Sequence, residues 1–250
     1  MNVSIIIVSW NTEELLKKCI ESILRYSQNI EYEIIVVDNA STDNTTEMVT
    51  KNFPIVKLIA NKKNLGFAKA NNQGIQISTG KYVLLLNPDT EFIDESLDRA
   101  IEKLTDDNIG VLGCKLLNTD KSIQPSVRRF PRVLDIIAIL IKLHKLFPSL
   151  LNKYLTKNFN YSHEQEVDQV MGAFFFVPRI VFDKIGLLDE GYFIWFEEVD
   201  FCRRAKREGY KVIYFPETQI IHHGSQSFAQ AMTWQKQKWF FRSAFRYLTK

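Results

Sequence analysis

Short apolar runs alternate with amphipathic segments over the first half of the chain. The runs are too short for helices, and polar turns, glycine or proline border them, so each predicts a strand buried on both faces. The segments between them carry apolar residues at helical spacing. This alternation is typical of an α/β fold with a mostly parallel central sheet flanked by helices. The expected strands span Val3–Ser9, Glu33–Val37, Val56–Ala60, Tyr82–Leu86 and Gly110–Leu117.

The alternation becomes irregular beyond residue 117, although no repeat, low-complexity tract or linker divides the chain. We therefore expect one domain over residues 1–250, with an N-terminal half at 1–117, an irregular half at 118–225 and a C-terminal amphipathic helix at 226–250. Expected elements of the later part are a basic loop at 126–131, a helical segment at 133–157, a loop at 158–169, strands at 170–177, 212–215 and 219–222, and helices at 197–208 and 233–248.

Composition narrows the classes of protein that remain. A chain of 250 residues has ample core for one large domain. The net charge of +3 is small and the basic residues are not massed in one run, which argues against a nucleic-acid partner. Three widely spaced cysteines without a C-x-x-C motif suggest neither disulfides nor zinc, and favour a reducing compartment. The sequence opens without a secretory leader, and charged residues interrupt its apolar stretch at 133–151, so we expect a cytoplasmic protein without a membrane span.

Polar clusters follow three of the expected strands where those strands end. Parallel strands would bring the clusters to one edge of the sheet, where ligands bind in open α/β folds. Asp89, which Pro88 lifts to the strand end, suits a hard divalent cation that bridges phosphate oxygens, and Asp38 suits hydroxyl or ring N–H groups of a nucleotide. The alternative role for either carboxylate is a turn or helix cap. The clusters are Ser9–Asn11, Asp38–Ser41 and Asn87–Asp89.

Seven short motifs also occur in a fixed order between residue 3 and about residue 225. Each motif alone is short, so the argument depends on the ordered set. The set resembles the family 2 glycosyltransferases, in particular the rhamnosyltransferase-like branch that builds bacterial surface polysaccharides. The motifs are Ile7–Asn11, Val37–Asp43, Asn64–Ala68, Leu85–Asp89, Met171–Phe174, Gly186–Glu190 and Phe196–Arg204.

This resemblance implies a GT-A fold, a nucleotide-diphospho-sugar donor, Mg²⁺ or Mn²⁺ as cofactor, and inverting transfer to a hydroxyl of a glycan or lipid-linked glycan. Rhamnose is the common donor sugar of the branch. Residues 1–117 would bind the donor and residues 118–225 would form the acceptor side. Asp89 and His222 would bind the metal ion, with Asn87 in place of the first acid of the family's Asp-x-Asp pattern. The residues expected to bind the donor are Val8, Ser9, Trp10, Asp38, Asn39, Asn64, Gly66, Asn71, Asn87 and Arg128.

Inverting transfer also needs a carboxylate that takes the proton from the acceptor hydroxyl. Glu197, Glu198 and Asp200 open an expected helix, where the helix dipole favours ionised acids. The resemblance places Glu198 at the position of the base, with one methylene more than the usual aspartate, and leaves Asp200 as the second candidate. The alternative is that these acids cap the helix and pair with its arginines.

Two pairs of neighbouring residues have roles that the sequence leaves open. His222 and His223 are adjacent in an expected strand and point to opposite faces, so at most one of them faces the site. Arg128 and Arg129 could neutralise the donor pyrophosphate or guide an anionic acceptor. The alternatives are a solvated histidine and two exposed surface charges.

The segments 133–157 and 233–249 combine aromatic, aliphatic and basic residues. Such helices can lie on an anionic membrane surface, which would suit a lipid-linked acceptor and place the protein at the inner face of the plasma membrane. They can equally pack on the core or form a homodimer interface.

Three other functions remain to be weighed against sugar transfer. A nucleotidyltransferase that makes sugar nucleotides would carry a glycine-rich loop after the first strand, and Ser9–Thr12 contains no glycine. A dehydrogenase is excluded in the same way, because no G-x-G-x-x-G motif is present. A non-catalytic binding or scaffold subunit is the third possibility, which the acids at 38, 89 and 198 argue against.

Overall fold

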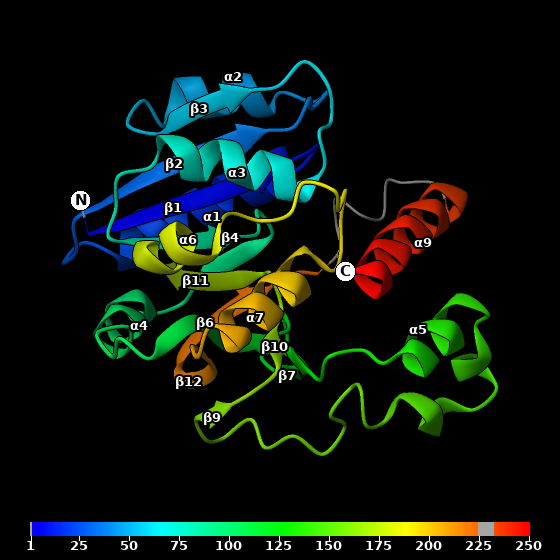
Figure 1. Ribbon diagram of the computed structural model, residues 1–250. Coiled ribbons are helices and arrows are strands. Elements are labelled where there is room, and N and C mark those ends of the chain that lie inside the picture. Colours follow the sequence, from blue (N-terminus) through cyan, green and yellow to red (C-terminus); the bar gives the residue numbers. More distant parts are fainter. Residues whose placement is uncertain (1, 225–232) are drawn as a thin grey trace.

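A central mixed β-sheet organises the fold (Figure 1). The structure is a computed structural model, and it describes residues 2–224 and 233–250. Strands of the main sheet follow the order β3-β2-β1-β4-β11-β6-β12-β5. These strands are β1 (Val3–Ser9), β2 (Tyr32–Asp38), β3 (Lys57–Ala60), β4 (Tyr82–Leu86), β5 (Thr90–Phe92), β6 (Ile109–Leu117), β11 (Phe174–Pro178) and β12 (Lys211–His222). Shorter strands are β7 (Ile123–Gln124), β8 (Val127–Arg128), β9 (Gln165–Glu166) and β10 (Gln169–Val170).

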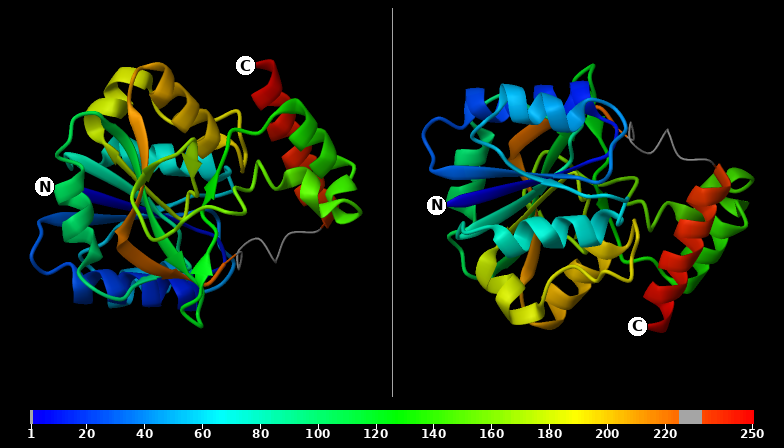
Figure 2. Two further views of the ribbon diagram at one scale, coloured as in Figure 1. Left: turned by 90° about the horizontal axis from the view of Figure 1, so that it is seen from below. Right: turned by 90° about the horizontal axis from the view of Figure 1, so that it is seen from above.

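Helices cover both faces of the sheet, which explains why its strands are continuously apolar (Figure 2). The helices are α1 (Glu13–Tyr26), α2 (Thr45–Asn52), α3 (Phe67–Ile77), α4 (Ser96–Lys103), α5 (Val133–Leu140), α6 (Arg179–Ile185), α7 (Glu197–Arg207) and α9 (Thr233–Thr249), with 3₁₀ turns η1 (Leu143–Lys145) and η2 (Pro148–Leu151). Alternate residues of β1 point to the two faces of the sheet: Ile5 and Ile7 pack with α1, α2 and α4, whereas Ile6 and Val8 pack with α3, α6 and α7.

The expected parallel arrangement of the first strands is confirmed. β1 pairs in parallel with both β2 and β4, with Ser9 opposite Asp38 and Ile7 opposite Leu86. The carboxyl ends of these three strands therefore lie along one edge of the sheet. Beyond β4 the sheet becomes mixed, because β11 runs antiparallel to both β4 and β6.

The irregular half differs from expectation in several places, and the expected loops at 126–131 and 158–169 contain the short strands β8 and β9. The expected strand at 170–177 is interrupted: a turn at 171–173 separates β10, which pairs with β8 in a small second sheet, from β11 in the main sheet. The two expected strands at 212–215 and 219–222 are one strand, β12, whose register against β6 shifts between Phe215 and Gln219. The segment 133–157 is α-helical only at Val133–Leu140, since Lys142 adopts a left-handed backbone with φ of 58° and Pro148 opens a separate turn.

Helices α5 and α9 lie side by side at one end of the molecule, beyond the sheet (Figures 1 and 2). They share a small core in which Ile136 of α5 and Ala244 and Tyr247 of α9 pack with Tyr192 and Phe196. Of the expected C-terminal segment, residues 226–232 lie outside the described residues. Within the described chain, none of the helices combines the length and the apolar character required to cross a bilayer.

Candidate functional site

A cavity of about 390 Å³ opens at the carboxyl ends of β1, β2 and β4. Ten of the fourteen residues that the sequence nominated line this cavity. They are Val8, Trp10, Asn39, Asn64, Gly66, Asn87, Asp89, Arg128, Glu198 and His222. Residues from seven separate stretches of the sequence thus meet in one place, as expected if the strand ends form a ligand site.

Asn39 organises the wall that follows β2. Its Nδ2 donates hydrogen bonds to Asn64 Oδ1 at 2.9 Å and to the carbonyl of Gly66 at 3.2 Å, and its Oδ1 accepts one from the backbone N–H of Leu65 at 3.0 Å. Gly66 has φ of +86°, and a Cβ there would lie 2.5 Å from the carbonyl oxygen of Phe193. Only glycine therefore allows this wall to approach the loop that follows β11 and α6 so closely.

Three nominated residues lie behind the wall and do not line the cavity. Ser9 Oγ is 2.9 Å from Thr12 Oγ1, and Asn71 Nδ2 donates to the carbonyl of Phe67 at 2.9 Å. Asp38 is buried, and its Oδ2 accepts a hydrogen bond from the N–H of Ser41 at 3.0 Å. The other oxygen of Asp38, Oδ1, is buried without a hydrogen-bond partner among the described residues. A hydrogen-bond acceptor of this kind beside Asn39 is suited to an N–H or O–H group of a ligand.

Asp89 and His222 form the candidate metal pair. Asp89 Oδ1 lies 3.4 Å from His222 Nε2, and both side chains are only 7% exposed. Nδ1 of His222 is 2.6 Å from Gln124 Oε1, while Gln124 Nε2 donates to Asn118 Oδ1 at 3.0 Å. The amide oxygen of Gln124 can only accept, so Nδ1 carries the hydrogen and Nε2 presents a lone pair to the cavity. Nε2 is buried and has no hydrogen-bond partner in the described chain.

The pair fits a divalent cation whose other ligands come from a bound substrate. Carboxylate oxygen and neutral imidazole nitrogen are both ligands of Mn²⁺, and carboxylate oxygen suits Mg²⁺. The described residues contain no group of three or more His, Cys, Asp or Glu side chains that could bind a metal ion by itself. Asn87 lines the cavity where a second acid would stand. The adjacent His223 does not line the cavity, and its Nε2 is 2.7 Å from Glu91 Oε1.

Glu197 and Glu198 enter the cavity from the first turn of α7. The two preceding residues, Trp195 and Phe196, have φ of 64° and 66°, a region that bulky side chains rarely adopt. Strain of this kind persists where the surrounding structure enforces it, and it is found most often at functional sites. Oε2 of each glutamate is buried without a hydrogen-bond partner in the part of the chain described.

Burial shifts the protonation of both glutamates. It raises the pKa of Glu197 well above its ordinary value, and the neighbouring charge of Glu198 raises it further. Burial also raises the pKa of Glu198, and the guanidinium of Arg128 opposes that rise. Glu198 is thus the more readily ionised carboxylate of the pair, close to a cation at the rim of the cavity. These are properties of a general base.

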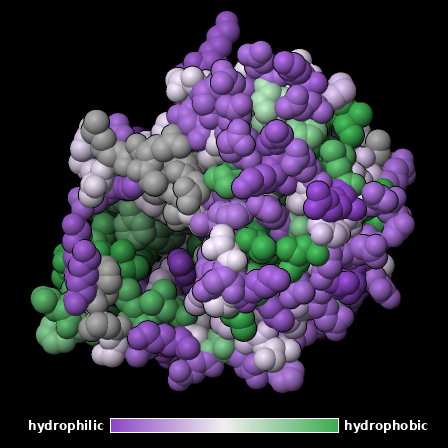
Figure 3. Space-filling model, turned by 180° about the vertical axis from the view of Figure 1, so that it is seen from behind, coloured by the Kyte–Doolittle hydropathy of each residue, from purple (hydrophilic) through white to green (hydrophobic). Residues whose placement is uncertain are grey.

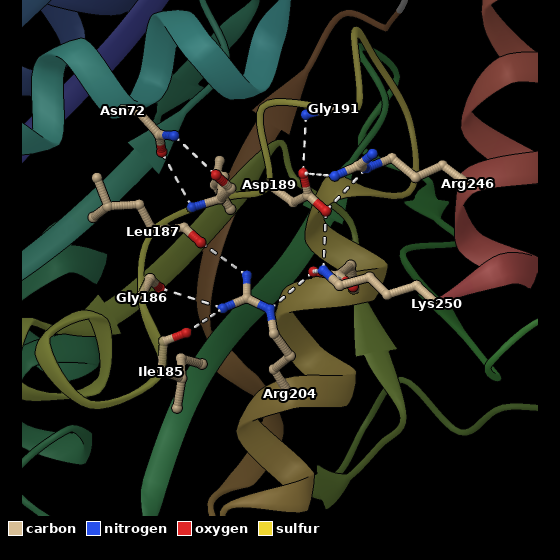
Figure 4. Close-up of polar contacts among 11 residues, drawn as sticks. Asn72, Ile185, Gly186, Leu187, Asp189, Gly191, Arg204, Arg246 and Lys250 are labelled. Carbon is tan, nitrogen blue, oxygen red and sulfur yellow. Dashed lines mark hydrogen bonds and ion pairs between the residues drawn. The ribbon is translucent and has the colours of Figure 1, made fainter.

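Asp200, the second candidate for the base, does not line the cavity. It is buried and lies 2.9 Å from Arg204 Nε and 2.8 Å from Lys250 Nζ. Lys250 and Arg246 also bind Asp189, at 3.0 and 2.8 Å, so this ion-pair network ties the end of α9 to the loop before α7 (Figure 4). Asp200 therefore pairs with an arginine of its own helix, which is the alternative role that the sequence offered.

Several lining residues were missed by sequence reasoning. Trp239 of α9 stacks on Phe193, with ring centroids 4.6 Å apart, and both line the cavity with Trp195. The aromatic run Tyr192–Phe196 directly before the acids was a signal for a pocket wall. In contrast, the placement of Trp239 depends on how α9 packs, which no local pattern predicts.

Comparison with known proteins gives a consistent result. The family model described as "Glycosyl transferase family 2" matches residues 4–184. An N-acetylglucosaminyl-diphospho-decaprenol L-rhamnosyltransferase from Mycobacterium tuberculosis is 27% identical over 208 residues, covering 78% of this chain and 67% of the relative. Rhamnosyltransferase WbbL from Escherichia coli is 28% identical over 261 residues, covering 99% of this chain and 93% of the relative.

Solved structures agree on the fold. The mannosyltransferase PcManGT from Pyrobaculum calidifontis, in complex with GDP-Man and Mn²⁺, superposes with a TM-score of 0.65 at 18% identity, covering 98% of this chain and 64% of that one. GalNAc-T7, with UDP, GalNAc and Mn²⁺, gives a TM-score of 0.65 at 17% identity, covering 88% of this chain and 43% of that one. This chain therefore spans less than two thirds of either solved structure, and the likeness shows the GT-A fold. Because the family model covers most of its length, the chain belongs to glycosyl transferase family 2.

Proposed function

We propose that the protein transfers a sugar with inversion from a nucleotide-diphospho-sugar to a hydroxyl of a glycan acceptor. The observation that carries this proposal is the convergence of the Asp89–His222 pair and the carboxylate of Glu198 on one cavity. The pair is suited to the leaving diphosphate, and Glu198 is suited to the attacking hydroxyl. Both are needed in one site for a displacement at a single anomeric carbon.

The nucleotide is assigned to the wall formed by the ends of β1 and β2. Val8 and Trp10 offer apolar surface to a base, and Asn39 holds the adjoining loop in place beside them. Oδ1 of Asp38 is an acceptor without a partner, and a modest rearrangement of the wall would expose it to a ring N–H or a ribose hydroxyl. Arg128 reaches the cavity from β8 and supplies a cation for the diphosphate.

Asp89 Oδ1 and His222 Nε2 would hold the divalent cation, either Mg²⁺ or Mn²⁺. When bound, such a cation acts as a Lewis acid that stabilises the charge developing on the leaving diphosphate. The complexes of PcManGT and GalNAc-T7 both contain Mn²⁺, which supports a divalent cation in this fold. Asp89 is the single carboxylate of this pair, so we expect weaker metal binding before the donor arrives than with two acids.

Glu198 acts as the base in this scheme. Its carboxylate accepts the proton of the acceptor hydroxyl while the oxygen of that hydroxyl forms a bond to the anomeric carbon. The bond from that carbon to the diphosphate oxygen breaks on the opposite face, and the nucleoside diphosphate leaves with the bonding pair. We assign the base to Glu198 and not to Asp200, because Asp200 is held in ion pairs outside the cavity.

The names of the relatives support a proposal for the donor sugar and the acceptor. The mycobacterial relative is named for transfer of L-rhamnose to N-acetylglucosaminyl-diphospho-decaprenol, and the Escherichia coli relative is named a rhamnosyltransferase. We therefore propose rhamnose as the donor sugar and a lipid-linked glycan at the cytoplasmic face of the membrane as the acceptor. A non-catalytic scaffold subunit is not favoured, since the cavity retains unpartnered carboxylate and imidazole groups that a binding protein does not need.

A thermal-shift screen against nucleoside diphosphates and sugar nucleotides, with and without Mn²⁺ or Mg²⁺, tests the donor half of the proposal. We expect a sugar nucleotide to raise the melting temperature more when the cation is present. Incubation of that donor with extracted lipid-linked glycan and mass analysis of the product tests the transfer. Donor binding without any transferred sugar would favour the scaffold alternative, and the absence of donor binding would contradict both.

A further inference from the structure

The outer face of α9 carries a stripe of exposed hydrophobic residues. Trp234, Phe241, Phe245 and Leu248 are spaced by seven, four and three residues, so they lie on one side of the helix. Their exposed fractions are 60%, 57%, 63% and 41%. The opposite side of α9, which includes Tyr247, packs against the loop before α7. The exposed stripe is therefore additional to the apolar surface that the helix needs for folding.

Helix α5 and the turns after it repeat this arrangement. Ile136 packs inward against α9, while Leu134, Ile137 and Ile141 face outward at a spacing of three and four residues. Eleven of the fifteen large hydrophobic residues that are exposed in the described chain lie in residues 133–150 and 233–250. Seen from behind, hydrophobic side chains gather at the lower left, over the α5 segment (Figure 3).

The same two segments hold the positive charge of the molecule. Residues 133–157 and 233–250 contain nine lysines and arginines and one acid, Asp135, which is buried and paired with Arg132. The rest of the chain has 23 basic and 28 acidic residues, so it is net negative. Lys142, Lys145, Lys238 and Arg242 form no ion pair with an acid of the described residues. An exposed apolar face rimmed by unneutralised cations is suited to an anionic lipid surface.

We propose that the outer face of α5 and α9, which we call the basal face, binds the surface of an anionic bilayer. It is defined by Leu134, Ile137, Ile141, Phe241 and Phe245 with the surrounding lysines and arginines. Pairing of two basal faces in a symmetric dimer would bring like charges together, whereas phosphate headgroups neutralise them. The charge therefore favours a membrane over a second copy of the chain.

The basal face is continuous with the site. Tyr192 and Phe196, which flank the aromatic wall of the cavity, pack against the inner sides of the same two helices. Trp239 of α9 lines the cavity itself. Docking of α5 and α9 on the bilayer would thus hold the mouth of the cavity near the headgroups, where a lipid-linked sugar is presented. This inference deepens the proposed function and depends on it only for the acceptor.

Flotation of the full chain with vesicles tests the proposal. The protein should float with phosphatidylcholine vesicles that contain phosphatidylglycerol, less with phosphatidylcholine alone, and less at high salt. Replacing Phe241 and Phe245 by serine should weaken binding by about tenfold or more, because two apolar side chains no longer enter the interface. The matched control replaces Ile55 and Ile180, which are 70% and 66% exposed on other surfaces, and should bind like the parent.

A charge variant provides a second comparison. Lys238→Glu with Arg242→Glu should abolish the preference for phosphatidylglycerol, whereas Lys51→Glu with Lys62→Glu should not. All variants should keep the thermal shift that the parent shows with its nucleotide, which separates loss of docking from loss of folding. A parent protein that stays at the bottom of every gradient would overturn the proposal. A parent dimer that the Phe241→Ser, Phe245→Ser variant converts to a monomer would also overturn it, and would make the basal face a subunit interface. Donor binding is measured separately, so flotation without donor binding would contradict the proposed function and leave this inference standing.

Discussion

Gln124 Oε1 lies 2.6 Å from His222 Nδ1 and fixes which nitrogen of that ring faces the cavity. The two residues come from β7 and β12, which are 98 positions apart in the sequence. Gln124 is itself held by Asn118, so the tautomer of His222 depends on a chain of two amides. Gln124, which does not line the cavity, thereby determines which nitrogen of His222 presents its lone pair to the cavity.

Removal of this hydrogen bond should weaken metal binding. We expect Gln124→Leu to lower the affinity for Mn²⁺ by about ten- to a hundredfold, as loss of an outer partner of a ligating histidine does. Gln124→Glu keeps an acceptor for Nδ1 and should retain the affinity. Electron paramagnetic resonance of Mn²⁺ with a nucleoside diphosphate measures the free ion directly. Equal affinities for the parent and Gln124→Leu would show that Gln124 does not control metal binding through His222.

Asp89→Ala should abolish the dependence on metal and lower turnover by about a hundredfold or more, because the diphosphate loses its main charge stabilisation. The control is Glu91→Ala, since Glu91 pairs with His223 outside the cavity. Both variants are compared in the rate of sugar transfer at saturating Mn²⁺. An Asp89→Ala protein that still responds to Mn²⁺ as the parent does would remove Asp89 from the metal site.

The pH dependence of turnover reports on Glu198. Burial raises the pKa of this carboxyl group. As the pH is lowered, the base should therefore become protonated, and activity should fall, at a higher pH than for an ordinary glutamate. Arg128 opposes this rise, so Arg128→Ala should move the acidic limb of kcat to still higher pH. Arg129→Ala is the matched control, because Arg129 does not line the cavity. Identical limbs for the parent and Arg128→Ala would contradict the electrostatic coupling.

Glu33 makes the stability of the sheet dependent on pH. Burial raises its pKa, but hydrogen bonds from Lys57, Ser4 and Thr79 outweigh that effect and bring the pKa to about 2, from an ordinary value of 4.5. Because the pKa is lower in the folded state, the contribution is present above about 4.5 and is lost as the pH falls toward 2. A shift of this size corresponds to about 3 kcal/mol at most, and solvent screening reduces the contribution because the side chain of Lys57 is half exposed.

Chemical denaturation at neutral and at acidic pH measures that contribution. We expect Glu33→Gln to destabilise the protein at neutral pH and to differ less from the parent as the pH is lowered. Glu21→Gln, at an exposed position of α1, should leave the stability unchanged at both. A penalty for Glu33→Gln that stays constant with pH would show that packing, not charge, is what the substitution removes.

The convergence of the strand-end residues on one cavity could be predicted from the sequence, for a physical reason. A strand buried on both faces leaves a strong apolar signal, and the polar residue at its end marks the edge of the sheet. Asn39 and Asp89 could therefore be placed together once three parallel strands were expected. The same reasoning could not separate Asp38 from Asn39, because the direction of a side chain beyond a strand end depends on the turn, here with Ala40 at φ of 67°.

The later half was harder to predict because its contacts are distant in sequence. The break between β10 and β11 reflects pairing with β8 on one side and β4 on the other, and nothing local to residues 170–177 signals it. Likewise, Gln124 meets His222 only because β7 and β12 both pair with β6. The ion pair of Asp200 with Lys250, at the far end of the chain, is another contact that no local pattern predicts.

Single-turnover transfer by Glu198→Gln and Asp200→Asn, with the donor selected by thermal shift, tests the central claim most directly. Glu198→Gln should bind the donor and Mn²⁺ as the parent does and transfer the sugar about a hundredfold more slowly or worse, since it lacks only the proton acceptor. Asp200→Asn should lose stability through its ion pairs with Arg204 and Lys250 but should transfer at a similar rate once folded. The opposite result, with transfer at the parent rate by Glu198→Gln and none by folded Asp200→Asn, would contradict the account.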